Sequence, residues 1–225
     1  MPHFYWKTDY LGPKNTYNIL DFLKFREKHE KEIVFNEPIN PCKEIVNALL
    51  KGEVVALFMD NSEFGPRALG HRSLIADPRF RVTTDWINQN IKSREWFRPI
   101  APFVLDEDLE EVFDTDRQLP HMLYAVPVRE KYRQLLSAST HIDGTARVQS
   151  VSQESHPFLY ELLRLYKEKI GVGVLLNTSF NRKGEPIIET LDEAMNCFLS
   201  TPIHLLAIPP YIIRKKENPP NPLRH

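Results

Sequence analysis

The sequence has few cysteines, few glycines and no long apolar run, and each scarcity excludes a class of protein. Its two cysteines, Cys42 and Cys197, lie too far apart for a CxxC metal knuckle and do not indicate a disulfide scaffold. No stretch approaches the roughly 20 apolar residues that a membrane-spanning helix needs. The first residues lack the basic start and apolar run of a signal peptide, so we expect a cytoplasmic protein with no membrane partner.

A strong charge of either sign is also missing, since 29 basic and 30 acidic residues give a net charge of -1. A chain without a global basic field is not typical of a nucleic-acid-binding domain. With 225 residues and an apolar share of 42%, the chain can bury a sizeable core as one large domain or two small ones. Its 18 prolines against 8 glycines predict many fixed turns and extended segments.

Helical and strand-like segments alternate along the chain, which predicts an α/β or α+β fold with a mixed sheet. The clearest expected helices are 41–52, 83–96, 156–171 and 190–201. We expect Thr83 or Thr84 to cap the second of these, and Thr190 with Glu193 to form a capping box on the last. The clearest expected strands are 53–59, 98–105, 172–180 and 203–215, and the prolines of 98–105 favour an edge or terminal position.

Four polar clusters follow or interrupt the apolar strands. They are EFGPRALGHRS (63–73), IKSREWFRP (91–99), DGTARVQSV (143–151) and LLNTSFN (175–181). Strand ends are where ligands bind in open α/β sheets, and arginine holds phosphate or carboxylate in two-point contacts. The cations of these clusters are Arg67, Arg72, Lys92, Arg94, Arg98 and Arg147. Together they would suit a polyanion, but a single arginine near a turn is usually a solvated surface residue, and spacing does not show that the clusters converge.

Other kinds of site find little support. The histidines are scattered without an HExxH or HxH pair, and no GxxxxGK[ST] loop is present. Ser179 lacks the flanking glycines of a nucleophile elbow, so a hydrolase is not indicated. Trp96 and Phe97 would be able to stack on a base, but such aromatics more often pack in a core.

The four clusters, in this order, resemble the C-terminal region of the nodulation-type O-carbamoyltransferases. The resembling segments are EFGPRALGHRSLIADPR, IKSREWFRPIAP, DGTARVQSV and GVGVLLNTSFNRKGEPIIET. The resemblance implies a YrdC-like domain with a twisted mixed sheet, expected over residues 41–215. Residues 1–40 are then expected to be a lead-in or linker and residues 216–225 a mobile tail.

The resemblance also implies an activity, which is formation of carbamoyl adenylate from carbamoyl phosphate and ATP. YrdC-like sites use a lysine and an arginine followed by serine-x-asparagine. The expected catalytic residues are Lys92, Arg98 and Arg147. The expected substrate-binding residues, of which the amides and hydroxyl would orient phosphate oxygens, are Arg67, Asn177, Ser179 and Asn181. Mg²⁺ is expected with ATP, although no acidic cluster identifies its ligands, and no metal held by this chain is expected.

The sequence departs from the family in lacking the N-terminal transfer domain, which resembles the actin-like ATPase fold and holds a metal through histidines. A domain or subunit of that kind is the expected partner. Smaller departures are Asp60 and Asn61 in a turn that commonly contains glycine, and His71 where asparagine is usual. Two alternatives stay open, namely a non-catalytic nucleotide- or partner-binding module and a YrdC-like threonylcarbamoyl-adenylate or RNA-binding protein. Arg72 matches no family role, and we interpret it as structural, paired with a carboxylate such as Asp77.

Overall fold

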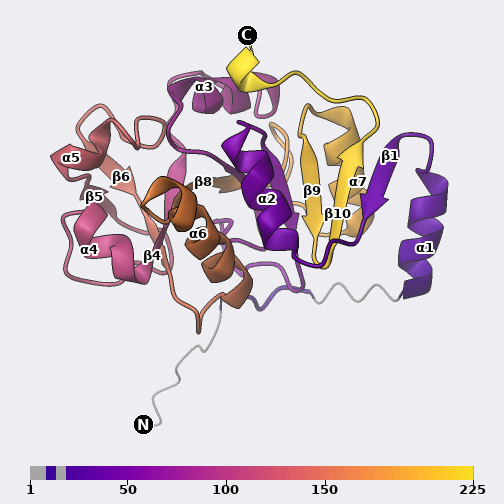
Figure 1. Ribbon diagram of the computed structural model, residues 1–225, viewed down its shortest axis with the longest axis horizontal. Coiled ribbons are helices and arrows are strands. Elements are labelled where there is room, and N and C mark those ends of the chain that lie inside the picture. The colour runs from indigo at the N-terminus through magenta and orange to yellow at the C-terminus, as the bar shows by residue number, and fades with distance from the viewer. Residues whose placement is uncertain (1–8, 14–18, 225) are drawn as a thin grey trace.

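The computed structural model describes residues 9–13 and 19–224, in which a mixed sheet carries helices on both faces (Figure 1). In the described residues this sheet has eight strands, in the spatial order β1 (Ile33–Asn36), β10 (Tyr211–Lys215), β9 (Leu205–Ile208), β2 (Val55–Phe58), β3 (Arg72–Ala76), β8 (Val174–Ser179), β4 (Ala101–Leu105) and β7 (Gln149–Val151). The pairs β2–β9 and β4–β7 are parallel and the other neighbours are antiparallel. The predicted class, a mixed sheet flanked by helices, is confirmed.

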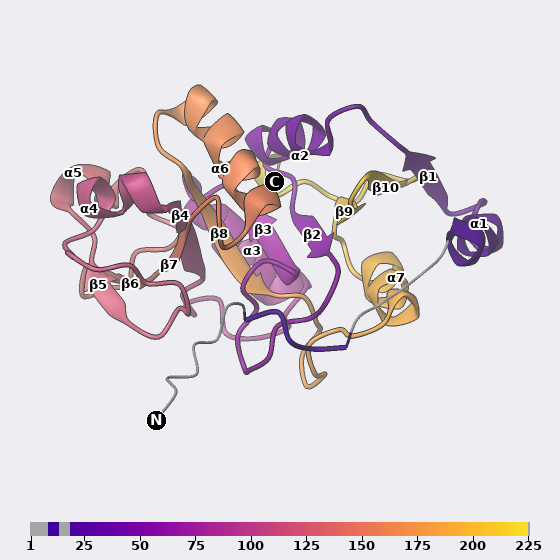
Figure 2. The same cartoon turned by 90° about the horizontal axis from the view of Figure 1, so that it is seen from below.

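Helices and a small second sheet complete the fold. The described helices are α1 (Ile19–Lys28), α2 (Pro41–Leu50), α3 (Arg81–Asn90), α4 (Leu109–Val112), α5 (Glu130–Arg133), α6 (Pro157–Ile170) and α7 (Leu191–Ser200), with the 3-10 turns η1 (Asp106–Asp108) and η2 (Pro222–Arg224). The second sheet pairs β5 (Ala125–Pro127) with β6 (Thr145–Arg147). Figure 2 shows α2 and α6 on one side of the main sheet and α7 on the other.

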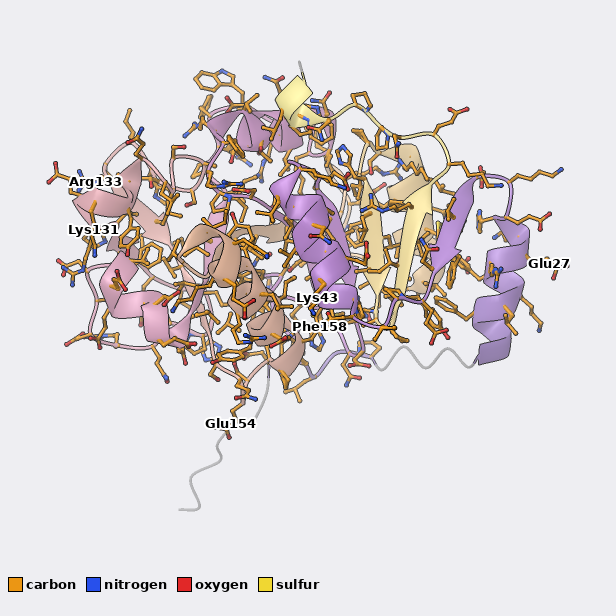
Figure 3. The ribbon with its side chains drawn as sticks, viewed as in Figure 1. Glu27, Lys43, Lys131, Arg133, Glu154 and Phe158 are labelled. Atoms are coloured by element: carbon orange, nitrogen blue, oxygen red, sulfur yellow. The ribbon has the colours of Figure 1, made fainter. Side chains whose placement is uncertain are left out.

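The central strands are buried on both faces. On β2, Ala56 and Phe58 join the core under α3 and α7, while Val55 and Leu57 join the core under α2 and α6. Successive side chains of a strand point to opposite faces, so a strand covered on both sides is apolar throughout. This explains the unbroken apolar run from residue 54 to 59. The outer surfaces instead carry exposed charges, such as Glu27, Lys43, Lys131 and Arg133 (Figure 3).

The helix ends follow capping chemistry, with one correction. Thr190 and Glu193 form the expected capping box of α7, and Gly171 ends α6 with a φ of 92°. The prediction that Thr83 or Thr84 caps α3 is wrong, because the helix begins at Arg81. Both threonines are instead buried within its first turns, where Thr84 Oγ1 donates a hydrogen bond to the carbonyl oxygen of Ala138 over 2.8 Å.

The two expected flanking segments contribute contacts to the domain. Strand β1, in the expected lead-in, pairs with β10, and Phe22 and Phe25 of α1 belong to the core under α3 and α7. In the expected tail, the Nδ2 group of Asn221 donates to the carbonyl oxygen of Lys51 over 2.9 Å. The domain boundaries at residues 40 and 215 stay predictions.

Candidate functional site

All four polar clusters converge on one small cavity at the end of β8 and the start of β4. Its volume is about 120 Å³, and its lining is Pro66, Arg67, Ala68, Arg94, Pro99, Ile100, Ala101, Met122, Arg147, Asn177, Thr178 and Ser179. A larger hollow of about 530 Å³ lies beside α1 and β1, but its lining contains no residue of the four clusters. The residues of the four clusters therefore identify the smaller cavity as the candidate site.

Three arginines from three different clusters make this cavity strongly cationic. Arg67, Arg94 and Arg147 line it, and no carboxylate of the described residues does so. Burial, followed by the positive charge of Arg67, lowers the pKa of Arg147, and burial followed by Arg98 lowers that of Arg94. The Nε group of Arg147 is buried without a hydrogen-bond partner among the described residues. Crowded and partly unpaired guanidinium groups favour an anionic ligand.

A buried amine lies behind the cavity. The side chain of Lys92 is 4% exposed, and its Nζ contacts Ser179 and Asn181, which end β8 and open the next loop. The Nζ group donates to Ser179 Oγ over 3.2 Å, to Asn181 Oδ1 over 2.6 Å and to the carbonyl oxygens of both residues. Burial, followed by the charge of Arg94, lowers the pKa of Lys92 to about 7. Ser179 also lines the cavity, so the residue that binds the amine of Lys92 forms part of the cavity wall.

Asn88, in the last turn of α3, fixes the loop that carries Lys92 and Arg94. The Oδ1 atom of Asn88 accepts a hydrogen bond from Arg94 Nε over 2.7 Å. Its Nδ2 group donates to the carbonyl oxygens of Trp96 and Arg98 over 3.0 and 2.8 Å. Asn88 is fully buried, so one rigid side chain sets the path of the loop on this side of the cavity.

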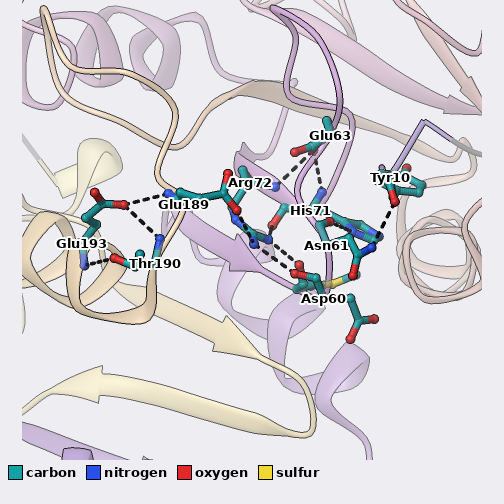
Figure 4. Close-up of polar contacts among 10 residues, drawn as sticks. Tyr10, Asp60, Asn61, Glu63, His71, Arg72, Glu189, Thr190 and Glu193 are labelled. Carbon is teal, nitrogen blue, oxygen red and sulfur yellow. Dashed lines mark hydrogen bonds and ion pairs between the residues drawn. The ribbon is translucent and has the colours of Figure 1, made fainter. Parts of the chain in front are cut away.

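The loop 63–72 is held by a buried carboxylate within it. Oε1 of Glu63 accepts the backbone N–H groups of His71 and Arg72 over 2.8 and 3.1 Å (Figure 4). The same oxygen accepts the backbone N–H group of Leu69 over 2.7 Å. The ring of Tyr10 stacks on His71, with centroids 3.6 Å apart, and its hydroxyl donates to the Leu69 carbonyl oxygen over 3.0 Å. These contacts place Arg67 and Ala68 against the ends of the strands.

Two side-chain amides tie the same loop to the sheet. Asn177 of β8 donates its Nδ2 group to the carbonyl oxygen of Ala68 over 2.8 Å, and Gln149 of β7 donates its Nε2 group to that of Leu69 over 3.0 Å. Both amides are buried, and their oxygen atoms have no hydrogen-bond partner among the described residues. These two bonds join three of the four clusters, and the bonds of Lys92 to Ser179 and Asn181 join the fourth.

Most of the expected site residues lie in or next to the cavity. Arg67, Arg147, Asn177 and Ser179 line it, while Lys92 and Asn181 lie behind Ser179. The side chain of Arg98 does not line it, is 57% exposed and forms an ion pair with Glu95 over 3.2 Å. Arg94 was expected only as one of six cations that would suit a polyanion, without a role of its own. Sequence reasoning missed Asn88, Glu63 and Gln149, because a buried polar residue has no sequence signature of its own.

Arg72 is structural, but the predicted partner was wrong. Its guanidinium is fully buried, lies 4.0 Å from the centre of the Phe58 ring and donates to backbone carbonyl oxygens, including that of Asp60 over 3.0 Å. Its carboxylate neighbour is Glu189, 3.9 Å away (Figure 4). Asp77 instead pairs with Arg79 over 2.7 Å. Arg72 and Asp77 lie at opposite ends of β3, and a five-residue strand spans about 17 Å.

Two further findings limit the kind of site. In residues 9–13 and 19–224, no group of three or more His, Cys, Asp or Glu side chains is placed to hold a metal ion. None of the helices described here combines the length and the apolar character that crossing a membrane requires.

The fold and the site together define a mixed α/β domain with an arginine-lined cavity. Residues 46–215 match the family model described as the carbamoyltransferase C-terminus, and the chain belongs to this family. The expected resemblance to the O-carbamoyltransferases is therefore confirmed.

The relatives are much longer proteins. The nodulation protein NolNO of Sinorhizobium fredii is 45% identical over 172 residues, which are 75% of this chain and 25% of that protein. The 3'-hydroxymethylcephem-O-carbamoyltransferase of Amycolatopsis lactamdurans is 47% identical over 150 residues, 67% of this chain and 28% of that enzyme. The chain thus spans about a quarter of the length of these curated relatives.

The fold also resembles a solved structure. The crystal structure of HypF from T. kodakarensis matches with a TM-score of 0.53 and 15% sequence identity, over 84% of this chain and 23% of that chain. At this identity the likeness shows the fold alone.

Proposed function

We propose that this chain makes carbamoyl adenylate from carbamoyl phosphate and ATP, as the activating part of an O-carbamoyl transfer. The observation that carries the proposal is the convergence of Arg67, Arg94 and Arg147 on one small cavity beside the buried amine of Lys92. Such a cavity suits a compact dianion such as a phosphate ester. Membership of the carbamoyltransferase C-terminal family supports carbamoyl phosphate as that ligand.

The reaction consumes one water molecule and releases two leaving groups. Water cleaves carbamoyl phosphate to carbamate and inorganic phosphate. A carbamate oxygen then attacks the α-phosphorus of ATP, the bond between the α-phosphorus and the bridging oxygen breaks, and pyrophosphate leaves. Negative charge accumulates on phosphate oxygens in this step, and fixed cations stabilise it.

The positions of the cations suggest a division of their roles. Arg67 and Arg147, in the cavity, would bind the phosphate of carbamoyl phosphate and later the adenylate. Lys92, held by Ser179 and Asn181, would stabilise the charge that develops at the α-phosphate. A cavity of about 120 Å³ is too small for a whole nucleotide. The exposed Arg98 at the neighbouring surface would then bind the nucleotide phosphates that extend outside it.

The remaining parts of the reaction would come from outside this chain. Mg²⁺ would arrive bound to the phosphates of ATP and neutralise part of their charge. Transfer to an acceptor hydroxyl would need a domain or subunit of the actin-like ATPase fold, and we place both steps in the cytoplasm. That partner would choose the acceptor.

The direct test is carbamoyl-phosphate-dependent exchange of labelled pyrophosphate into ATP by the purified chain with Mg²⁺. We expect exchange in the wild type, and a loss of about 100-fold or more in Lys92→Met, because the buried cation beside the cavity is removed. Lys215→Met is the matched control. Lys215 is also partly buried and bonded to a carbonyl oxygen, that of Thr201, but it lies outside the cavity lining, so exchange should persist.

Two results would contradict the proposal. One is the absence of exchange both in the chain alone and after addition of a transfer domain from a longer relative. The other is an equal loss in Lys92→Met and Lys215→Met, since the effect would then be one of stability. Anion binding by the wild type without exchange would favour the alternative of a non-catalytic binding module.

A further inference from the structure

The segment 9–13, which we call the strap, is bonded along the start of an arginine-bearing loop of the cavity. The N–H group of Gly12 donates to the carbonyl oxygen of Ser62 over 3.0 Å, and the N–H group of Phe64 donates to that of Asp9 over 2.8 Å. Two such bonds with opposite donors hold the strap and the loop together as two antiparallel strands are held. The strap lies outside the residues that match the family model, so that match assigns it no role.

Tyr10 extends from the strap to the far end of the same loop. Its hydroxyl donates to the carbonyl oxygen of Leu69 over 3.0 Å, and its ring stacks on that of His71 with centroids 3.6 Å apart and an interplanar angle of 11°. The carbonyl oxygen of Leu69 also accepts the Nε2 group of Gln149, so two donors from outside the loop fix one carbonyl group. The strap therefore holds the loop at both of its ends, with Arg67 between them.

The strap also contacts a second wall of the cavity. Tyr10 packs against a small apolar cluster that includes Ala101 and Met122, and both of these residues line the cavity. Oδ2 of Asp9 lies 2.9 Å from Nδ1 of His121, the residue before Met122. The strap therefore joins walls of the cavity that come from separate parts of the chain.

We propose that Tyr10 is a positioning residue, which holds the loop of Arg67 in the place where that arginine can bind an anion. The inference rests on the proposed function only in taking the cavity as the site of an anionic ligand. Tyr10 is not part of the cavity lining, so it acts through the loop and not on the ligand. A loop without such support has to be ordered when the ligand binds, and ordering costs free energy. The apparent affinity then falls with the fraction of molecules in which the loop is in place.

Variants of Tyr10 separate the ring from the hydroxyl. Tyr10→Leu removes the stacking and the hydrogen bond together, and it should weaken sulfate binding by about 10-fold or more. Tyr10→Phe keeps the ring, and Gln149 still donates to the carbonyl oxygen of Leu69, so affinity should stay within about threefold of the wild type. The double variant Tyr10→Phe/Gln149→Met leaves that carbonyl group without either donor. It should lose more affinity than the two single changes together.

A glycine in the strap allows a test that leaves the tyrosine intact. A Cβ atom on Gly12 would lie 1.9 Å from Ser62 Oγ and 2.8 Å from the carbonyl oxygen of Ser62, so Gly12→Ala must move the strap away from the loop. It should weaken sulfate binding several-fold. Phe22→Leu is the matched control, since Phe22 is also a buried ring, stacked on Tyr211 with centroids 4.3 Å apart. Neither of these two residues lines the cavity, so this variant should bind sulfate like the wild type.

The experiment is calorimetric titration of the full chain and its variants with sulfate, after circular dichroism shows that each variant is folded. Hydrogen exchange of the amides of Leu69, His71 and Arg72, which Glu63 Oε1 accepts, gives a second measurement. In Tyr10→Leu these amides should exchange faster than in the wild type, and saturating sulfate should slow them again, because ligand and strap stabilise the same loop. If Tyr10→Leu does not fold, Tyr10→Phe/Gln149→Met takes its place.

Weaker binding in Tyr10→Leu and Gly12→Ala, with wild-type binding in Phe22→Leu, supports the proposal. Unchanged affinity in Tyr10→Leu overturns it, and so do an equal loss in Phe22→Leu, faster exchange that sulfate does not reverse, or a wild type that binds no sulfate. Because binding is measured without ATP, these results stand apart from the pyrophosphate-exchange test. A chain whose sulfate affinity depends on the strap but which does not exchange pyrophosphate contradicts the proposed function alone.

Discussion

Lys92 is a buried amine whose charge depends on what lies beside it. Four oxygen atoms surround its Nζ, all from Ser179 and Asn181, yet burial and the charge of Arg94 lower its pKa to about 7. The charged and neutral forms of the amine therefore both occur near neutral pH. An anion in the adjoining cavity favours the protonated form, so anion binding and proton uptake at Lys92 should be linked.

This linkage predicts a pH dependence of anion binding. Lys92 is protonated below a pH of about 7 and neutral above it, so affinity should be highest on the acid side and fall several-fold between pH 7 and 8.5. Sulfate is a suitable probe for calorimetry because it does not titrate in this range. Lys92→Arg keeps a positive charge at all these values and should bind sulfate with little change over the same interval. A fall of equal size in Lys92→Arg would assign the effect to another group.

At the level of single residues, sequence reasoning found the correct clusters but did not show which of their side chains face the cavity. Arg67, Arg147 and Ser179 were expected in the site and line the cavity. Arg94 and Arg98 lie four positions apart in an irregular loop, and only the contacts of Asn88 decide that Arg94 faces inward. No periodicity governs such a loop, so the sequence could not show which of the two arginines faces the cavity.

The loop 63–72 shows how a backbone conformation places a functional side chain. Gly70 has a φ of 122°, in the region that favours glycine, and it lies against the ring of His156 at the start of α6. A Cβ atom there would lie 2.7 Å from His156 Nε2 and 3.0 Å from a methyl carbon of Leu159. The loop therefore rests directly on α6, three residues from Arg67.

Gly70→Ala is expected to destabilise the protein by about 1–3 kcal/mol, through backbone strain and the clash with His156. It should also weaken anion binding, because the loop moves away from the cavity. Gly65→Ala is the matched control, since Gly65 has a φ of 138° but no atom within 4 Å of an added Cβ. Urea unfolding and sulfate titration of both variants measure the two effects. A loss in Gly65→Ala as large as that in Gly70→Ala would show that strain alone acts.

Element positions were harder to predict than element types. The expectation that residues 98–105 form an edge or terminal strand is wrong, because β4 lies between β8 and β7. Pro102 is tolerated because the ladder with β7 begins only at Phe103, so its missing N–H removes no bond on that side. The sequence shows the proline but not where the neighbouring ladder begins.

For the whole molecule, the alternation of apolar helices and strands was enough to predict the class of fold. The order of the strands was not, since β2 lies beside β9 and β8 beside both β3 and β4. These pairings join residues far apart in the chain, and no local pattern encodes them. Convergence of the four clusters follows from that order, which explains why their spacing alone could not establish a single site.

The same packing buries several histidines, and this predicts loss of stability in mild acid. Burial lowers the pKa of His156 to about 3 and that of His204 to about 4, and it also lowers that of His71. In the unfolded chain a histidine takes up its proton near pH 6.5, so between that value and the folded pKa the unfolded state binds more protons. Stability is then fully present above pH 6.5 and falls as the pH drops toward 4.

Each fully buried histidine should lower the free energy of unfolding by up to about 2 kcal/mol between pH 7 and pH 5, as measured by urea unfolding across this range. His156→Asn tests the histidine whose pKa is lowered furthest and whose contribution to the acid sensitivity should be largest. His156 Nδ1 accepts the backbone N–H of Leu159 over 3.2 Å at the start of α6, and asparagine can replace this cap without a titrating ring. The variant should therefore lose less stability on acidification than the wild type. If His156→Asn follows the wild-type curve, the acid sensitivity arises elsewhere, since carboxylates protonate mostly below this interval.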